Sequence, residues 1–384
     1  MYINIFGSTG VIGSKCIEII SSYFPQLKID LLLACNNANK LISQANKIKP
    51  KAICLKNTKK INYYKNNLNP NIKIIDYKDL SNYLKSNRTK ASILSISGNS
   101  ALEYLEDILI NTKQLGLVNK ECIVSCGHLF KKLLTKYKVQ IFPLDSEHFS
   151  IFNLENNNAT YLKNFYKIYL TASGGPLLNF NKKRISNVSF NEVIKHPKWK
   201  MGYKNSIDSS TLANKCLELI EAMYLFKISI KNLDIVIHPE ALIHSIIEYK
   251  NSTSIFNYFY NDMSIPILNF IKYITNKELI KIEKFKFNKN LSLNFIEVNK
   301  NKFPIYDIFK NIDYKLPQQI IKFNAANQYA VELFKKDKIK YIQMPKIIEK
   351  SISYELKASI NSIGSIIKYE KEFNNIMISN YEKA

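Results

Sequence analysis

Short apolar runs alternate with amphipathic stretches through the first 145 residues of this 384-residue chain. The apolar runs predict strands near residues 2–6, 29–34, 52–55, 72–76, 91–96, 115–118 and 139–142. Stretches such as SKCIEIISSYF and KECIVSCGHLFKKLL lie between most of these runs and have the spacing of helices. This alternation is typical of a parallel sheet that is covered by helices on both faces. We therefore expect a doubly wound α/β domain over residues 1–145.

The pattern changes after residue 145. YKIYLTAS and LDIVIHP predict strands and SSTLANKCLELIEAMYLF predicts a helix, so a central α+β domain is expected over residues 146–274. A Lys- and Asn-rich stretch, TNKELIKIEKFKFNKNLSLNF, predicts a connector over residues 275–305, and its weak alternation also allows an edge strand. The pattern over residues 306–384 is helical and predicts a C-terminal helical domain.

A glycine-rich loop joins the first predicted strand to the following helix, in INIFGSTGVIGSKCIEII. Gly7, Gly10 and Gly13 allow a tight turn and a close approach of backbone to a pyrophosphate at the helix N-terminus. A Rossmann-like dinucleotide-binding domain is the prediction, and a tight turn without a ligand is the alternative. An acidic residue near Cys35, at the end of the second strand, would favour NAD. The segment LLLACNNANK has none there, which favours NADP, with Lys40 as the nearest basic residue.

Two carboxylates follow the last predicted strand of this domain, in PLDSEHFSIF. Ligands of open α/β sheets bind beyond the carboxyl ends of the strands. Asp145 and Glu147 lie just past such an end, and hard oxygen donors suit Mg²⁺ or Mn²⁺. The alternative is a solvated turn in which Asp145 or Ser146 caps the next helix.

A helix is predicted to begin near Asp208 or Ser209 and to run to about Phe226. Its polar stripe carries Glu218 and Glu221, and a solvated helix face has the same spacing. A carboxylate from this helix would complete a metal site with the two acidic residues described above. Three further segments predict ligand contacts: TASGGPL as a phosphate cradle or an ordinary turn, HPKWKMG as a mobile lid, and NKE at 119–121 as a strand–helix junction.

Composition restricts the classes of protein further. The formal net charge is +24, yet the lysines are spread along the chain and form no nucleic-acid-binding pattern. A basic surface of this kind attracts phosphorylated substrates. No apolar run approaches the roughly 20 residues that span a bilayer, and the chain opens directly on a strand-like segment. Six cysteines without a CxxC pair are expected to be reduced, and we expect a cytoplasmic protein without nucleic-acid or membrane partners.

Taken together, seven blocks resemble the 1-deoxy-D-xylulose 5-phosphate reductoisomerase family of the non-mevalonate isoprenoid pathway. They are GSTGVIG, VNKECIVSCGHLF, PLDSEHFSIF, LTASGGPL, HPKWKMG, IDSSTLANKCLELIEAMYLF and VIHPEALIHSIIEY. They occur in the order found in that family and span nearly the whole chain. The resemblance implies an oxidoreductase that uses NADPH and Mg²⁺ or Mn²⁺ to isomerise and reduce a small phosphorylated substrate, and a homodimer joined through the central domain.

The resemblance also implies roles for individual residues. The expected metal ligands are Asp145, Glu147 and Glu218. The expected catalytic and substrate-binding residues are Lys120, Ser146, Glu147, Ser173, His196, Ser209, Asn214, Lys215 and Glu218, with Trp199 and Met201 in a lid. The expected NADPH contacts are Gly7, Thr9, Gly10, Val11, Ile12, Gly13, Asn36, Asn37, Asn119, Glu121 and Gly202.

The chain departs from the family pattern at the cofactor site, where Cys35-Asn36 replaces the usual Gly-Lys and Val11 replaces a common serine. The sequence leaves two other classes of protein as alternatives. One is another Rossmann-type dehydrogenase, such as a semialdehyde or homoserine dehydrogenase, which needs no three-carboxylate metal site. The other is a decayed enzyme scaffold that binds nucleic acid, which would gather its lysines into one strip.

Overall fold

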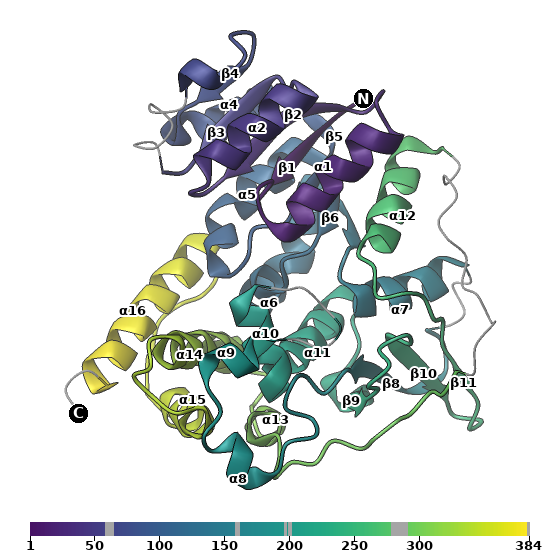
Figure 1. The fold of residues 1–384 in the computed structure, drawn as a ribbon, viewed down its shortest axis with the longest axis vertical. Helices are drawn as coiled ribbons and strands as arrows, with labels where there is room; N and C mark the ends of the chain where they lie inside the picture. The colour runs from purple at the N-terminus through teal and green to yellow at the C-terminus, as the bar shows by residue number, and fades with distance from the viewer. Residues whose placement is uncertain (58–64, 158–161, 196–197, 199–201, 278–290, 382–384) are drawn as a thin grey trace. The chain divides into compact units, whose positions relative to one another are not determined.

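The structure is a computed structural model, and it describes the chain except residues 58–64, 158–161, 196–197, 199–201, 278–290 and 382–384 (Figure 1). The chain divides into two units, which are described separately below. The first unit comprises Met1–Cys122, Lys131–Phe149 and Asp262–Lys284, and the second comprises Ile123–Phe130, Ser150–Asn261 and Phe285–Ala384. The four domain segments expected from the sequence remain a prediction.

The first unit is built on a seven-stranded parallel sheet in the order β4-β3-β2-β1-β5-β6-β7. Its strands are β1 (Tyr2–Phe6), β2 (Lys28–Ala34), β3 (Ala52–Leu55), β4 (Lys73–Ile75), β5 (Thr89–Leu94), β6 (Thr112–Leu117) and β7 (Gln140–Pro143). After its first residue, β2 is buried throughout, as expected for a parallel strand with both faces covered. All seven predicted strands are present, and the doubly wound fold class is confirmed.

Helices cover both faces of this sheet (Figure 1). They are α1 (Val11–Tyr23), α2 (Ala38–Ile48), α4 (Leu80–Ser86), α5 (Leu102–Asn111) and α12 (Ser264–Thr275). Helix α1 packs against α2 and α12, whereas α4 packs against α5. Helices α6 (Lys120–Tyr137) and α7 (Ser146–Asn157) begin in this unit and contribute residues to both units. The crossover helices follow the strands so that every βα loop lies at the carboxyl edge of the sheet.

The second unit contains a four-stranded sheet in the order β11-β10-β8-β9. Strands β8 (Phe165–Ala172) and β9 (Leu233–Ile237) are parallel, whereas β10 (Ser245–Tyr249) and β11 (Ser254–Ile255) run antiparallel. The two strands predicted in this region are confirmed as β8 and β9. Part of the predicted connector lies outside the described residues, and in its remainder Ile296 forms an isolated bridge to Ile237.

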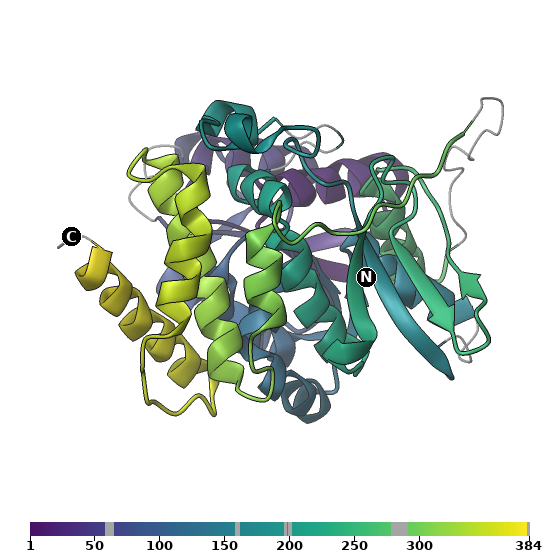
Figure 2. The same cartoon turned by 90° about the horizontal axis from the view of Figure 1, so that it is seen from below.

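Helices complete the second unit. They are α8 (Lys182–Ile185), α9 (Phe190–Val193), α10 (Tyr203–Thr211), α11 (Ala213–Leu225), α13 (Pro304–Lys310), α14 (Pro317–Lys335), α15 (Met344–Ile352) and α16 (Ile363–Tyr381). Figures 1 and 2 show α14 alongside α15 and α16, which are the light green to yellow helices. One hydrophobic cluster joins residues of β8, β9, α11 and the C-terminal helices. The helical prediction for the C-terminal region is confirmed over the described residues.

One predicted helix is wrong in its extent. The segment expected to run unbroken to Phe226 forms two helices, α10 and α11, that are separated by Leu212. Leu212 adopts a left-handed backbone conformation, with φ of 63°. Asp208 lies inside α10 and accepts a hydrogen bond from the Lys204 side chain at 2.6 Å, so it is not the predicted cap. Leucine is a strong helix former, so its side-chain type gives no sign of this break.

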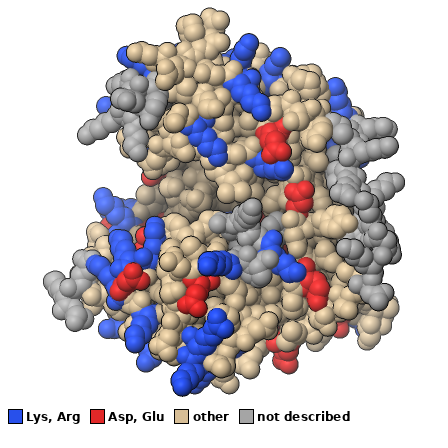
Figure 3. All heavy atoms as spheres, viewed as in Figure 1, with Lys and Arg blue, Asp and Glu red and all other residues tan. Residues whose placement is uncertain are grey.

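Among the described residues, no helix has the length and apolar character needed to cross a membrane. Figure 3 shows Lys and Arg side chains dispersed over the face in view, with Asp and Glu between them. The single basic strip that the nucleic-acid alternative requires is not seen on this face.

Candidate active site

The glycine-rich loop between β1 and α1 has the shape expected of a dinucleotide cradle. Gly7 has φ of 87°, and a Cβ atom there would lie 2.7 Å from the backbone of Ser95. The amides of Gly7 and Ser8 donate to the Leu33 carbonyl at 2.9 and 3.0 Å, which ties the loop to β2. Gly10 is the N-cap of α1 and has no side chain to occupy the helix N-terminus. The backbone amides of the loop and the N-terminus of the 13-residue helix α1 are therefore directed at one point, as an anion-binding site requires.

The segment after β2 lies beside this loop. Asn37 caps α2 by accepting a hydrogen bond from the Lys40 amide at 3.0 Å. The ammonium group of Lys40 donates to the Thr9 carbonyl at 3.0 Å, so Lys40 reaches the glycine-rich loop. Val11 is 63% exposed at the start of α1. These predicted cofactor contacts therefore share one edge of the sheet.

Asp145 and its neighbours begin α7 immediately after β7. One carboxylate oxygen of Asp145, Oδ1, accepts the amide of Glu147 at 3.2 Å and contacts His148 Nδ1 at 2.9 Å. The other oxygen, Oδ2, accepts a hydrogen bond from the Lys120 ammonium at 3.3 Å. Glu147 is only 9% exposed. The solvated turn considered from the sequence is therefore wrong for Glu147, although Asp145 does cap the helix.

The junction of β6 and α6 supplies the cation of this cluster. Asn119 caps α6 by accepting the Cys122 amide at 2.6 Å, and its side-chain amide donates to the carbonyls of Ile96 and Gly98 at 2.6 and 2.9 Å. This cap fixes the first turn of α6, where Lys120 and Glu121 are 7% and 4% exposed. A rigid first turn places the Lys120 ammonium against Asp145.

In the second unit, the break at Leu212 sets the direction of α11. Glu218 on this helix is 1% exposed and pairs with Lys215 through Oε2 at 2.5 Å. Its other oxygen, Oε1, accepts a hydrogen bond from the Asn214 side chain. Glu221 is fully buried, so the solvated helix face considered from the sequence is wrong. Burial raises the pKa of the neighbouring Cys216 thiol well above its usual range, which marks this thiol as a core group.

The TASGGPL loop lies against the end of α10. Gly175 has φ of 67°, and a Cβ atom there would lie 2.8 Å from the Ser209 carbonyl oxygen. The Ser173 hydroxyl accepts a hydrogen bond from the Gly175 amide at 3.3 Å. Glycine is required at this close approach, and it brings the loop that carries Ser173 next to Ser209. Two of the hydroxyl groups predicted to bind substrate thus belong to adjoining backbone segments.

Three carboxylates meet the geometric requirement for a metal. One oxygen from each of Asp145, Glu147 and Glu218 lies within 4.8 Å of the other two. Adjacent ligands of an octahedral Mg²⁺ are about 3.0 Å apart and opposite ligands about 4.2 Å, because each Mg–O bond is about 2.1 Å long. The 4.8 Å limit is wider than either spacing, so a bound cation would draw the three oxygens closer together.

Some predicted residues fall outside what the structure describes, and one contributing residue was missed. His196, Trp199 and Met201 of the predicted lid lie outside the described residues, whereas Gly202 is described as the N-cap of α10. His148 was not predicted as a site residue, but it is fully buried and orients Asp145. Its i,i+3 spacing from Asp145 on a helix was the available signal.

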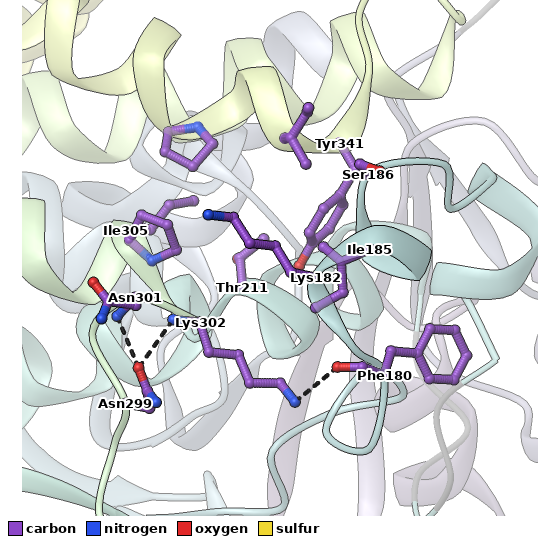
Figure 4. A pocket seen from close by; sticks show the side chains of 13 residues that line it. Phe180, Lys182, Ile185, Ser186, Thr211, Asn299, Asn301, Lys302, Ile305 and Tyr341 are labelled. Carbon is purple, nitrogen blue, oxygen red and sulfur yellow. Dashed lines mark hydrogen bonds between the residues drawn. The ribbon is translucent and has the colours of Figure 1, made fainter.

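A separate pocket of about 500 Å³ lies in the second unit (Figure 4). Its walls are mainly apolar and include Ile185, Ile305 and Tyr341. Lys302, at its edge, donates a hydrogen bond to the Phe180 carbonyl at 3.1 Å. Of the predicted site residues that the structure describes, none lines this pocket.

A doubly wound sheet with a glycine-rich βα loop, together with a buried carboxylate cluster, defines a class of metal-assisted oxidoreductases. Comparison with known proteins narrows this class. Three family models match the chain: 1-deoxy-D-xylulose 5-phosphate reductoisomerase at residues 3–127, the reductoisomerase C-terminal domain at 141–226, and the DXP reductoisomerase C-terminal domain at 260–376. The chain belongs to the 1-deoxy-D-xylulose 5-phosphate reductoisomerase family.

Relatives of that name match over most of their length. The protein of Pelagibacter ubique is 38% identical over 344 residues, which cover 88% of this chain and 87% of the relative. That of Clostridium tetani is 33% identical over 96% of both chains. A solved reductoisomerase in complex with NADPH, fosmidomycin and magnesium superposes with a TM-score of 0.88 at 27% identity, covering 100% of this chain and 98% of the other. The Zymomonas mobilis enzyme in complex with NADPH gives 0.89 at 25% identity, covering 100% and 99%.

Proposed function

We propose that the protein converts 1-deoxy-D-xylulose 5-phosphate to 2-C-methyl-D-erythritol 4-phosphate, using NADPH and Mg²⁺ or Mn²⁺. The observation that carries this proposal is the family match, which extends over both units and nearly the whole chain. Solved relatives hold NADPH, fosmidomycin and magnesium. The dehydrogenase alternative has no corresponding support, since the family models matched are those of reductoisomerases.

Asp145, Glu147 and Glu218 are the proposed metal ligands. Their oxygens lie within 4.8 Å of one another, and carboxylates are the donors that Mg²⁺ and Mn²⁺ prefer. Bound there, the metal would act as a Lewis acid on substrate oxygens. The residues of the chain keep the ligands in place: His148 and the first turn of α7 hold Asp145, and Asn214 and Lys215 hold Glu218.

The substrate phosphate is proposed to bind near Ser173, Ser209, Asn214 and Lys215. The support is the close approach of Gly175 to Ser209, which places hydroxyl groups of two segments together. Lys215 contributes positive charge, and its 9% side-chain exposure keeps that charge poorly screened. Lys120, which is also nearly buried beside Asp145, is the proposed donor of positive charge at the reacting oxygens.

NADPH is proposed to lie along the β1–α1 loop, where it would deliver hydride to the rearranged carbonyl. The support is the Gly10 position: a Cβ there would meet only backbone at 3.3 Å or more, so the space above the loop is open. Asn119, fixed by hydrogen bonds with Ile96, Gly98 and the Cys122 amide of its own helix turn, would border the nicotinamide end. Gly7, Thr9 and Ile12 would supply the loop backbone, and Asn36, Asn37, Glu121 and Gly202 further contacts.

The test is NADPH oxidation with 1-deoxy-D-xylulose 5-phosphate, with and without Mg²⁺ or Mn²⁺. We expect loss of NADPH absorbance that depends on both substrate and metal, and inhibition by fosmidomycin. The proposal is rejected if no substrate-dependent oxidation occurs under any metal condition. Activity that persists after removal of divalent cations would support the dehydrogenase alternative instead.

We further propose a homodimer that forms through the sheet of the second unit. Exposed apolar side chains lie beside both edges of this sheet: Phe256 follows β11 and is 41% exposed, and Leu293 precedes the bridge to β9 and is 37% exposed. Leu291, Phe295 and Ile296 lie in the same segment as Leu293 and are 44–46% exposed, and clustered exposed apolar residues mark interfaces. Light scattering should give a dimer for the wild type and a monomer for Leu293→Asp. Ile378→Asp, on α16 and similarly exposed, is the control that should remain dimeric; a monomeric wild type would overturn the proposal.

A cytoplasmic location is also proposed. The six cysteines are described as thiols, and reduced thiols are typical of a reducing compartment.

A further inference from the structure

The described residues that directly follow β2 include no obvious partner for a 2′-phosphate. In sheets of this type the end of β2 meets the adenosine ribose. Here β2 ends at Ala34, and the exposed Cys35 occupies the position where NAD-binding proteins carry an acid. Selection of NADPH needs a cation near this position, and neither Cys35 nor Asn36 supplies one.

Lys40, the basic residue nearest in sequence, is directed elsewhere. Its ammonium group donates to the Thr9 carbonyl at 3.0 Å. Thr9 belongs to the glycine-rich loop, which faces the pyrophosphate rather than the ribose. Lys40 therefore contacts the first βα loop and not the residues that follow β2.

Lys56 lies at the required place because of how the strands pair. Strand β3 runs parallel to β2, with Leu55 opposite Ala34. The pairing continues past the strand ends, since the Lys56 amide donates to the Ala34 carbonyl and the Asn57 amide to the Cys35 carbonyl, both at 3.0 Å. Lys56 thus flanks Cys35 at the carboxyl edge of the sheet.

The ammonium group of Lys56 is held in one position. It lies 2.5 Å from Glu103 Oε2, and it stands 5.5 and 5.7 Å from the ring centres of Tyr77 and Tyr104. Burial lowers the pKa of Lys56, but the hydrogen bond to Glu103 and the negative charge of that carboxylate outweigh this effect, and the pKa is raised. The side chain remains 29% exposed, so a ligand can reach it. A cation fixed in advance loses little conformational entropy when it binds a phosphate.

We propose that Lys56 supplies the positive charge that binds the 2′-phosphate of NADPH, with Glu103 as the residue that positions it. Lys56, directly after β3, would thus replace the lysine that the family usually carries after β2. This inference rests on the proposed use of NADPH. It concerns the binding energy of a single phosphate group, so it can be tested without turnover.

The test compares two fragments that differ only in that phosphate, 2′,5′-ADP and 5′-AMP, by calorimetric titration of the full-length protein. Lys56→Gln should weaken 2′,5′-ADP binding about tenfold and leave 5′-AMP binding unchanged, because a charge-assisted hydrogen bond is lost. Lys56→Arg keeps the charge and should restore most of the difference. The matched control is Lys136→Gln, which removes another lysine that pairs with a glutamate and lies over a tyrosine ring.

Each outcome separates the two proposals. If the wild type binds 2′,5′-ADP no more tightly than 5′-AMP, the proposed use of NADPH fails. If the wild type discriminates and Lys56→Gln discriminates equally well, or weakens both fragments alike, the role of Lys56 is overturned while NADPH use stands. A selective loss in Lys40→Gln instead would assign the phosphate to Lys40.

Discussion

The glycine-rich loop allows a prediction that separates folding from cofactor binding. A Cβ atom at Gly13 would lie 2.3 Å from the Gly7 carbonyl oxygen and 2.7 Å from the Cα atom of Ser8. Both contacts are with backbone, so no side chain can move aside. A Cβ atom at Gly10 would have its nearest contact at 3.3 Å, again with the Gly7 oxygen. The same substitution to alanine therefore has different consequences at the two positions.

The magnitudes follow from these contacts. Gly13→Ala forces α1 away from the β1 turn, and overpacking of this kind costs about 1–3 kcal/mol or more in the free energy of unfolding. Gly10→Ala replaces a glycine N-cap by alanine, which costs about 0.5–1 kcal/mol. However, its methyl group would stand where the backbone approaches the pyrophosphate, so NADPH affinity should fall at least about tenfold, or about 1.4 kcal/mol.

The assay combines urea unfolding, followed by circular dichroism, with fluorescence titration of NADPH. Gly364→Ala is the matched control, because a Cβ there would meet nothing within 4 Å and alanine suits a helix. We expect the control to bind like the wild type and to be at least as stable, Gly10→Ala to lose mainly binding, and Gly13→Ala to lose mainly stability. Wild-type stability in Gly13→Ala, or wild-type NADPH affinity in Gly10→Ala, would refute this description of the loop.

Three further predictions concern charged and thiol groups. Glu218→Gln should abolish the increase in melting temperature that Mg²⁺ produces in the wild type, because binding to the native state alone stabilises it; an unchanged increase in a folded variant would remove Glu218 from the ligands. Burial raises the pKa of Asp234, but hydrogen bonds from Lys167 and Tyr306 and the charge of Lys310 lower it from 3.8 to about 2. A carboxyl group with a lowered pKa stabilises the fold at pH values above the pKa that it has in the unfolded chain. The wild type should therefore be more stable than Asp234→Asn by about 1 kcal/mol, after allowance for solvent screening. Urea titrations should show this difference shrinking as the pH falls from 4 to 2. One of the six thiols, that of the exposed Cys35, should react rapidly with Ellman's reagent and be protected by NADPH; a second fast thiol would contradict this.

The fold of the first unit was predictable because its strands are buried on both faces. Each strand is a short continuous apolar run between helical patterns, as in KIDLLLA of β2, and the crossover rules then order the sheet. The break between α10 and α11 was not predictable. It depends on Leu212 adopting a left-handed conformation, which local sequence preference opposes and tertiary packing imposes.

The residues of the candidate site divide in the same way, into those that local sequence predicts and those whose position depends on tertiary packing. The acids were found because they follow strand ends or share a helix stripe, which are local properties. Lys56 was missed because its position depends on the pairing of β3 with β2, and no sequence spacing relates it to Cys35. The burial of Glu221 was missed for a similar reason. A polar helix stripe is interpreted as solvent-exposed when the packing around it is not known.

The two interpretations of PLDSEHFSIF, a helix cap or a metal ligand, prove compatible because a carboxylate has two oxygens. Oδ1 of Asp145 caps α7 and contacts His148, and this fixes the side-chain torsion angles. Oδ2 is then held beside Lys120, away from the helix amides. A capping residue can thereby also serve as a preorganised ligand, since the hydrogen bonds that begin the helix orient the second oxygen. Sequence spacing cannot separate these roles because both need an acid at the same position, and it is the buried imidazole of His148 that distinguishes this cap from an ordinary one.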